Sequence, residues 1–245
     1  MAVIAIIPAR LGSTRLPNKP LLRDTGKFLI QHVVEQVRRA EVLDEVIVAT
    51  DDESIVTACD HFGAQAVMTR ADHATGTDRI AEVARRLELA DDDIVVNVQG
   101  DEPEIDPASI VELVDLMRRC PDDTPMATLA TPLAVADAAD PNRVKVVFDL
   151  AGRAMLFSRS PIPFDRDGTG NVQPYLHLGL YAYRAGFLQT FTGLPQTPAE
   201  RAEKLEQLRA LEHGYRIAVG VVLEHTAGID TPADYAAFVA RYNNS

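Results

Sequence analysis

The sequence predicts an α/β fold, Rossmann-like, in which a mostly parallel central sheet carries helices on both faces and a smaller β-rich lobe is attached. Two observations lead to this prediction. Short apolar runs alternate with longer amphipathic stretches over residues 1–120, and the second half is rich in β-type runs with few helices between them. Strands that alternate with helices pair in parallel, because each helix returns the chain to the same edge of the sheet.

Four strand–helix units account for the first half. Short apolar runs predict strands over residues 3–8, 45–50, 65–68 and 93–98. Amphipathic stretches predict helices over residues 29–40, 53–62, 77–87 and 107–119. The first helix carries Ile30, Val33 and Val37 on one stripe, and Pro107 and Pro121 bracket the fourth.

The second half continues with strands and two helices. The predicted strands are 126–131, 144–148, 154–157, 176–183 and 217–223, and the predicted helices are 202–213 and 232–242. Along 176–183 the side chains alternate, so that His177, Tyr181 and Tyr183 share one face while Leu178 and Leu180 share the other. We expect the last strand and helix to return to the main sheet.

Composition excludes several classes of protein. The chain has 245 residues with 24 basic and 36 acidic side chains, a net charge of −12, which argues against non-specific binding to nucleic acid or anionic membrane. Cys59 and Cys120 form no CxxC motif, which excludes a zinc site built from cysteines alone. No apolar run approaches about 18 residues, and the N-terminus lacks signal-peptide features, so we expect a cytoplasmic protein.

The loop after the first strand is unusually basic. Residues 1–23 contain no acid but include Arg10, Arg15, Lys19 and Arg23. Ligands of open α/β sheets bind outside the carboxyl ends of the strands, and arginine forks suit phosphate. We interpret this loop as an anion-binding site, the alternative being a solvated basic loop. The motifs GxGxxG and GxxxxGK[ST] are both absent, so the sequence has neither the motif of a Rossmann dinucleotide site nor that of a Walker-type ATP site.

Two acidic positions follow predicted strands. The strand 93–98 delivers Gln99, Gly100 and Asp101, where glycine permits close backbone approach to a ligand and the carboxylate suits a magnesium ion. Asp230 follows the strand 217–223, but it could equally cap the last helix. The run 91–93 (DDD) precedes its strand and indicates a solvated turn, and residues 51–52 (DD) are explained as a helix N-cap.

Seven stretches resemble those of sugar-acid cytidylyltransferases, and more narrowly of 3-deoxy-manno-octulosonate cytidylyltransferases. They are IPARLGSTRLPNKP (7–20), TRADHATGTDR (69–79), VNVQGDEP (96–103), FSRSPIPFDR (157–166), HLGLYAYR (177–184), LEQLR (205–209) and GIDTP (228–232). Their order is that of the family, from Ile4 to about Pro232. Asn18 stands where the family usually has glycine, and Ala74 with Thr75 stands where it often has a Gln–Ser pair.

The resemblance implies transfer of CMP from CTP to 3-deoxy-D-manno-octulosonate, and it assigns residues to four roles. The catalytic residues are Arg10, Arg15, Lys19 and Asp101. The nucleotide contacts are Ala9, Arg10, Ser13, Thr14, Arg15, Lys19, Thr75, Arg79, Gln99 and Gly100. The sugar-acid contacts are Gln99, Arg159, Arg166, His177, Tyr181, Glu206 and Gln207. The ligands of Mg²⁺ are Asp101 and Asp230.

The family further implies one domain over 1–245. In it, 1–131 and 214–245 form the nucleotide-binding core, and about 132–213 form the sugar-acid-binding and dimerisation lobe of a homodimer. The product would serve lipopolysaccharide synthesis. Alternatives are a cytidylyltransferase for a related acid, such as an amino-substituted octulosonate or an acylneuraminate, and a non-catalytic nucleotide-sensing module. Taken singly, His177 and Tyr181 could each be structural.

Overall fold

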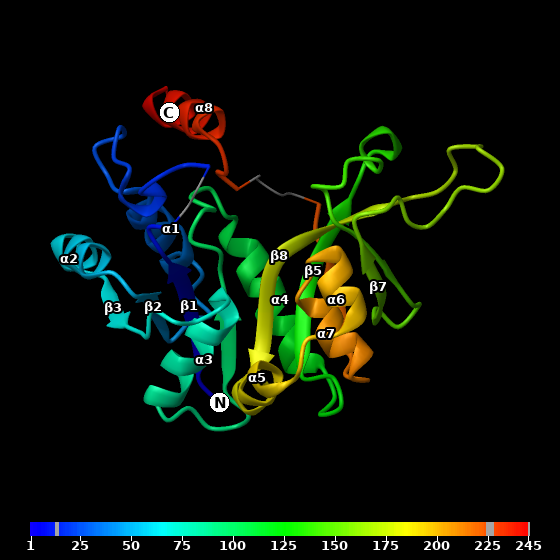
Figure 1. Cartoon of the computed structure of the whole chain (residues 1–245), viewed down its shortest axis with the longest axis horizontal. Helices are drawn as coiled ribbons and strands as arrows, with labels where there is room; N and C mark the ends of the chain where they lie inside the picture. Colours follow the sequence, from blue (N-terminus) through cyan, green and yellow to red (C-terminus); the bar gives the residue numbers. More distant parts are fainter. Residues whose placement is uncertain (13–14, 224–227, 245) are drawn as a thin grey trace.

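The computed structural model describes residues 1–12, 15–223 and 228–244, and within them it has one sheet of nine strands. Seven strands form the main path in the order β3-β2-β1-β4-β8-β5-β9 (Figure 1). Their bounds are β1 (Val3–Ala9), β2 (Glu45–Thr50), β3 (Gln65–Met68), β4 (Ile94–Asn97), β5 (Met126–Pro132), β8 (Tyr175–Arg184) and β9 (Ile217–Val221). A hairpin of β6 (Lys145–Phe148) and β7 (Ala154–Ser158) branches from β8.

Strand direction confirms a mostly parallel sheet. β1 pairs in parallel with both of its neighbours, β2 and β4, and β9 pairs in parallel with β5. β8 alone on the main path runs the other way: Tyr181 lies opposite Asn97 of β4 and opposite Thr128 of β5. Residues 175–184, which the sequence division assigned to the smaller lobe, therefore lie in the middle of the main sheet.

Eight α-helices occur in the described residues, seven between strands and α8 after the last strand. They are α1 (Leu29–Arg38), α2 (Glu53–His61), α3 (Gly76–Arg86), α4 (Pro107–Arg119), α5 (Ala185–Gly193), α6 (Pro198–Glu203), α7 (Gln207–Glu212) and α8 (Pro232–Asn243). The prediction of one helix over 202–213 is wrong, because Lys204 adopts a left-handed backbone with φ of 55° and separates α6 from α7. The sequence interpretation also missed α5.

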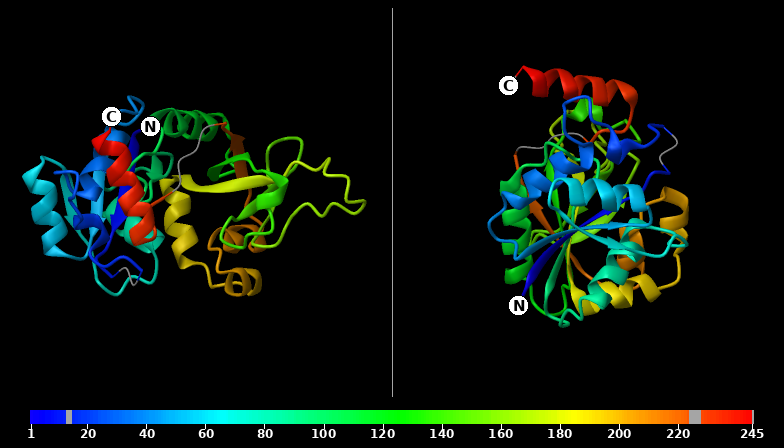
Figure 2. Two further views of the ribbon diagram at one scale, coloured as in Figure 1. Left: turned by 90° about the horizontal axis from the view of Figure 1, so that it is seen from above. Right: turned by 90° about the vertical axis from the view of Figure 1, so that its left-hand side faces the viewer.

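Two apolar cores cover the two faces of the sheet (Figure 2). One core joins α1, α2 and α4 to one face and contains Leu178, Leu180 and Ala182 of β8. The other joins α3, α5 and α7 to the opposite face and contains Tyr181 and Tyr183. The predicted alternation of side chains along β8 is therefore confirmed, and both faces of this strand are buried.

A third, smaller cluster fastens α8 to the carboxyl edge of the sheet. Leu16, Leu29, Ile229, Tyr235 and Phe238 are all buried in it. The hydroxyl of Tyr235 also accepts a hydrogen bond of 2.9 Å from the backbone N–H of Asp24. The cluster thus ties the first loop and α1 to α8, which lies above the edge where the parallel strands end (Figure 1).

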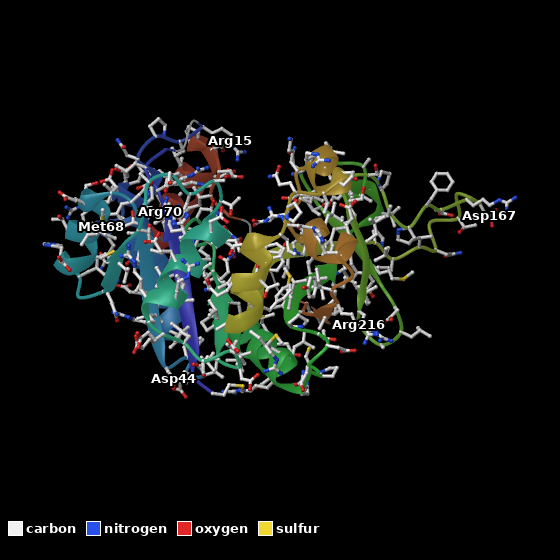
Figure 3. All side chains as sticks on the ribbon, turned by 60° about the horizontal axis from the view of Figure 1, so that its bottom comes forward. Arg15, Asp44, Met68, Arg70, Asp167 and Arg216 are labelled. Atoms are coloured by element: carbon white, nitrogen blue, oxygen red, sulfur yellow. The ribbon has the colours of Figure 1, made fainter. Side chains whose placement is uncertain are left out.

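The β6–β7 hairpin and the segment that follows it extend away from the main sheet. Asp167 lies near the far end of this arm (Figure 3). No helix of the described residues is long and apolar enough to cross a membrane.

Candidate active site

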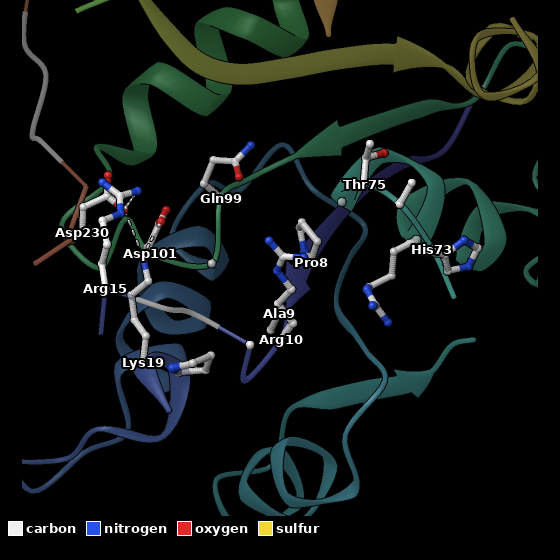
Figure 4. A pocket seen from close by; sticks show the side chains of 16 residues that line it. Pro8, Ala9, Arg10, Arg15, Lys19, His73, Thr75, Gln99, Asp101 and Asp230 are labelled. Carbon is white, nitrogen blue, oxygen red and sulfur yellow. Dashed lines mark hydrogen bonds and ion pairs between the residues drawn. The ribbon is translucent and has the colours of Figure 1, made fainter. Parts of the chain in front are cut away.

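Loops from four strand ends meet in one cleft of about 440 Å³ at the carboxyl edge of the sheet (Figure 4). They follow β1, β3, β4 and β9. Residues that the sequence interpretation placed near nucleotide or metal line this cleft: Ala9, Arg10, Arg15, Lys19, Thr75, Arg79, Gln99, Gly100, Asp101 and Asp230. Ser13 and Thr14 fall outside the described residues.

The ammonium of Lys19 lies between the two acids. Its Nζ is 2.8 Å from Asp101 Oδ2 and 3.3 Å from Asp230 Oδ1, and it donates a 2.7 Å hydrogen bond to the carbonyl of Ile229. The Arg15 guanidinium adds a 3.2 Å ion pair to Asp230. The side chain of Lys19 is only 13% exposed, so this part of the basic loop is not a solvated one.

The backbone holds both groups in place. Lys19 opens a short 3₁₀ helix that follows Asn18, whose φ of 55° lies in the left-handed region that glycine and asparagine tolerate. Asp230 precedes α8 but does not cap it, because Thr231 is the N-cap and accepts a hydrogen bond from the Asp234 N–H. The capping alternative for Asp230 is therefore wrong, and its carboxylate faces the cleft.

Gly100 is required by a neighbouring strand. A Cβ atom at this position would lie 2.7 Å from the carbonyl oxygen of Pro8, closer than such atoms approach. The close approach is thus between the end of β1 and the loop after β4. The sequence interpretation had assigned the need for glycine to a ligand, and the structure gives this packing reason instead.

The start of α3 forms another wall of the cleft. Thr75 and Asp78 cap the helix reciprocally, with hydrogen bonds of 3.1 and 3.0 Å, so Asp78 has a structural role as expected. Arg79 is 4% exposed and forms a 2.9 Å ion pair with Asp51. Asp52 caps α2 as predicted, whereas its neighbour Asp51 neutralises this buried guanidinium.

His73 lines the cleft and was not among the predicted residues. Its Nε2 is in close contact with Glu82, which also accepts a 3.1 Å hydrogen bond from the Arg70 N–H and pairs with Arg86. Burial would raise the pKa of Glu82, but these donors outweigh it and keep the pKa below its usual value. The sequence feature that could have indicated a role for His73 is its place within the stretch 69–79.

A second pocket of about 230 Å³ adjoins the cleft and shares Pro8, Gly76 and Gln99 with it. It brings together four residues predicted to contact a sugar acid: Gln99, Tyr181, Glu206 and Gln207. Its remaining wall is formed by Thr77, Asn97, Tyr183 and Phe191. The Thr77 hydroxyl donates a 2.7 Å hydrogen bond to Glu206, and burial raises the pKa of this carboxyl.

Three of the residues predicted to contact the sugar acid line neither pocket: Arg159, Arg166 and His177. Arg159 donates to the carbonyls of Glu203 and Pro141 at 2.7 and 2.9 Å, so its guanidinium fixes loops. Arg166 is exposed and directly precedes Asp167, which lies near the far end of the arm (Figure 3). The structure does not place these two side chains in contact with either pocket, because one is already bound to backbone carbonyls and the other is carried away from the sheet.

The ring of His177 belongs to an aromatic row. Its centroid is 4.9 Å from that of Phe157 and 5.3 Å from that of Tyr181, and its Nε2 is 3.1 Å from the Thr128 hydroxyl. Burial lowers the pKa of His177 to about 3, which keeps the imidazole neutral. His177 lines neither pocket, and this packing suits the structural alternative, while its contact with the sugar acid stays a prediction.

The chain is similar over almost its whole length to known proteins. The model of the cytidylyltransferase family matches residues 4–217. A 3-deoxy-manno-octulosonate cytidylyltransferase of Syntrophobacter fumaroxidans is 54% identical, over 98% of this chain and 96% of the relative. An 8-amino-3,8-dideoxy-manno-octulosonate cytidylyltransferase of Shewanella halifaxensis is 50% identical, over 98% of both chains.

A solved structure resembles the whole chain. It is that of a CMP:2-keto-3-deoxy-manno-octonic acid synthetase complexed with CTP. It superimposes with a TM-score of 0.94, at 43% identity, over 100% of this chain and 99% of the other.

Proposed function

The chain belongs to the cytidylyltransferase family, and we propose that it transfers CMP from CTP to the anomeric hydroxyl of 3-deoxy-D-manno-octulosonate with release of pyrophosphate. It is a nucleotidyltransferase. The observation that carries the proposal is the pair of adjoining pockets. One is lined by cations and two carboxylates, the other by hydroxyl, amide and carboxylate groups, and Pro8, Gly76 and Gln99 form the wall between them.

The first cleft suits the triphosphate. Arg10, Arg15 and Lys19 line it, and a nucleoside triphosphate carries about four negative charges that such groups neutralise. Arg10 forms no ion pair among the described residues, whereas Arg79 is already neutralised by Asp51. Arg15 and Lys19 are paired with Asp101 and Asp230 in the protein alone, and a metal ion held by these two acids would release them for phosphate. We therefore assign most of the charge stabilisation of the triphosphate and of the departing pyrophosphate to the first loop.

Asp101 and Asp230 are the residues that would hold Mg²⁺. They come from separate strand ends, yet both contact one Lys19 ammonium, so both point at one place. No group of three His, Cys, Asp or Glu side chains that could bind a metal occurs in the described ranges. Two carboxylates fit magnesium, which typically takes one or two of them and completes its shell with phosphate oxygens and water. The bound ion would neutralise phosphate charge.

The protein's own contribution to the reaction is orientation and charge neutralisation. The anomeric oxygen attacks the α-phosphorus in line with the departing pyrophosphate, so both substrates must meet at the wall formed by Pro8, Gly76 and Gln99. Gln99 is held there by a 3.2 Å hydrogen bond from its Nε2 to the carbonyl of Gly179. A covalent nucleophile is not needed for such a transfer.

Pyrophosphate release tests the proposal. Purified protein with CTP and Mg²⁺ is offered 3-deoxy-manno-octulosonate, its 8-amino analogue, N-acetylneuraminate, or no acid. We expect release with the first acid and none without an acid. Calorimetric binding of CTP with no release in any mixture would instead identify a nucleotide-sensing module, and release with N-acetylneuraminate alone would identify a different acid.

A homodimer is the assembly that we propose, formed through the arm and the β6–β7 hairpin. Large apolar side chains are exposed there: Leu150, Met155, Leu156 and, at 80% exposure, Phe164. Burying such a patch stabilises association. Light scattering should give twice the monomer mass, and Phe164→Ser should weaken the dimer. We further propose a cytoplasmic enzyme that supplies the activated sugar for lipopolysaccharide synthesis.

A further inference from the structure

The first cleft has two ends of different chemistry (Figure 4). Asp101, Asp230 and Lys19 gather at one end, whereas His73 and Thr75 lie at the other. Under the proposed function, the charged end takes the phosphates, and the α-phosphorus lies at the wall that the two pockets share. The end that remains for the nucleobase is the one that His73 lines. Recognition of the base therefore depends on the polar atoms there.

Glu82 decides which nitrogen of the His73 ring carries the proton. Nε2 of His73 is in close contact with the Glu82 carboxylate, and the two side chains are only 11% and 10% exposed. Burial would raise the pKa of Glu82, but the hydrogen bonds from His73 and from the Arg70 N–H hold it below its usual value. The carboxylate is thus ionised and can only accept, so the proton in this contact belongs to Nε2.

The other ring nitrogen of His73 is free to accept a hydrogen bond. Nδ1 has no hydrogen-bond partner among the described residues, and it is not one of their buried, unpartnered polar atoms, so solvent reaches it. A second proton on the ring is not needed for charge balance, because Glu82 already pairs with Arg86. The charge of Arg10 in the same cleft also opposes a further cation. The imidazole is therefore neutral, and Nδ1 presents a lone pair.

A single acceptor at this place distinguishes the two common pyrimidines. Cytosine carries an amino group at C4, whereas uracil carries a carbonyl oxygen at the same position. The amino group donates to a lone pair. A carbonyl oxygen placed against the same lone pair has no donor and loses the hydrogen bond that it made with water.

We propose that His73 Nδ1 accepts a hydrogen bond from the 4-amino group of cytosine and thereby selects CTP over UTP, with Glu82 as the positioning residue that keeps the proton on Nε2. This inference rests on the proposed function. Glu82 also accepts a 3.1 Å hydrogen bond from the Arg70 N–H, so it holds the loop between β3 and α3 against the helix. His73 determines specificity and takes no part in the chemical step.

The test compares CTP with UTP in two assays. One is calorimetric binding of each nucleotide without an acid, and the other is kcat/KM for pyrophosphate release with saturating acid. His73→Phe keeps a flat ring and removes both nitrogens. We expect the preference for CTP to fall about tenfold through KM for CTP, while kcat and KM for the acid hardly change.

Glu82→Gln tests the position of the proton separately. The glutamine amide both donates and accepts, so either nitrogen of the His73 ring can then carry the proton. The ring can donate to the uracil oxygen as well as accept from cytosine, and UTP should gain several fold relative to CTP. A Glu82 that only holds the loop would weaken binding of both nucleotides equally.

His61→Phe and Glu112→Gln are the matched controls. His61 on α2 and Glu112 on α4 line neither pocket, so both variants should keep the ratio of CTP to UTP. Melting temperatures identify a variant that fails to fold, and the wild type then provides the test. A nucleotide whose C4 carries hydrogen in place of the amino group should bind about tenfold more weakly than CTP.

The outcomes separate this inference from the proposed function. An unchanged ratio in His73→Phe overturns the inference, and so do equal losses for CTP and UTP in both variants. Binding of the nucleotide without the amino group as tightly as CTP overturns it as well. Each of these results leaves the proposed function standing. Failure of the wild type to release pyrophosphate from CTP with any acid overturns the proposed function, and the calorimetric ratio still decides the role of His73.

Discussion

Replacing Lys19 by methionine separates the two roles that the structure gives to this side chain. In the protein alone, Lys19 Nζ neutralises Asp101 and Asp230, while during the reaction the same charge would act on the triphosphate. Lys19→Met keeps the length of the stem and removes the charge. It leaves Asp101 without its ion pair and Asp230 with Arg15 alone, so the two carboxylates repel each other unless another cation lies between them.

The size of the effect follows from exposure. A charge-assisted hydrogen bond contributes about 1.5–3 kcal/mol when buried, but exposed ion pairs contribute about 0–1 kcal/mol. The carboxylates of Asp101 and Asp230 are 32% and 49% exposed, so we expect a loss of about 1–2 kcal/mol in the free energy of unfolding. For a chain of this size that corresponds to a melting temperature lower by roughly 2–4 °C.

Magnesium should reverse the loss of stability without restoring activity. With millimolar Mg²⁺ and no substrate, the ion can take the place of the ammonium, and the melting temperature of Lys19→Met should return toward that of the wild type. Turnover should remain about 10²–10³-fold lower, because the charge on the triphosphate is missing. Differential scanning fluorimetry and pyrophosphate release measure the two effects.

Lys27→Met is the matched control, since it removes an ammonium 2.6 Å from Glu35 outside the cleft. Its melting temperature should not respond to magnesium more than that of the wild type. An unchanged melting temperature and an absent magnesium response in Lys19→Met would refute the proposed metal site between the two acids. Near-normal turnover would refute the role of Lys19 toward the triphosphate.

Three further predictions concern other parts of the structure. Asp101→Asn should abolish turnover while the fold survives, and magnesium-dependent turnover close to that of the wild type would contradict its role as a metal ligand. His177→Phe should change the pH dependence of stability. The pKa of His177 is about 3 in the folded protein and 6.5 in the unfolded chain, so the free energy of unfolding of the wild type falls as the pH drops below 6.5, by up to about 1.4 kcal/mol per pH unit. Urea unfolding of the variant should show a shallower dependence of this free energy on pH in that range. Tyr235→Phe leaves the Asp24 N–H without its partner and should lower the free energy of unfolding by about 0.5–1.5 kcal/mol, measured by urea unfolding. Because α8 holds the first loop, the same change should raise KM for CTP more than KM for the acid.

Local patterns predicted the first half of the fold well, because each strand and helix there is defined by its own periodicity. β8 shows the limit of such patterns. The alternation along 176–183 predicted which side chains share a face, but it could not indicate that β4 and β5 would take the two edges of this strand. The break between α6 and α7 depends on the left-handed backbone of Lys204, a residue that carries no helix-ending signal.

The candidate site divides in the same way. Residues at strand ends were predictable because parallel strands deliver their carboxyl ends to one edge, and Lys19, Asp101 and Asp230 meet there. The hydrogen-bond partners of Arg159 and His177 were not predictable, because they are distant in sequence: the carbonyl of Glu203 for Arg159 and the Thr128 hydroxyl for His177. A residue type suited to binding a sugar acid is equally suited to satisfying a buried oxygen.

Asp51 and Asp52 show how context decides between two such uses. The two acids are adjacent at the end of β2, yet Asp52 caps α2 while Asp51 pairs with the buried Arg79. Because Arg79 is neutralised in this way, it can line the cleft without adding net positive charge. Arg10, which forms no ion pair within the described ranges, retains its charge for a ligand. Under the proposed function, the first loop would therefore position the triphosphate, and this loop is also the segment that Leu16 and Ile229 fasten to α8.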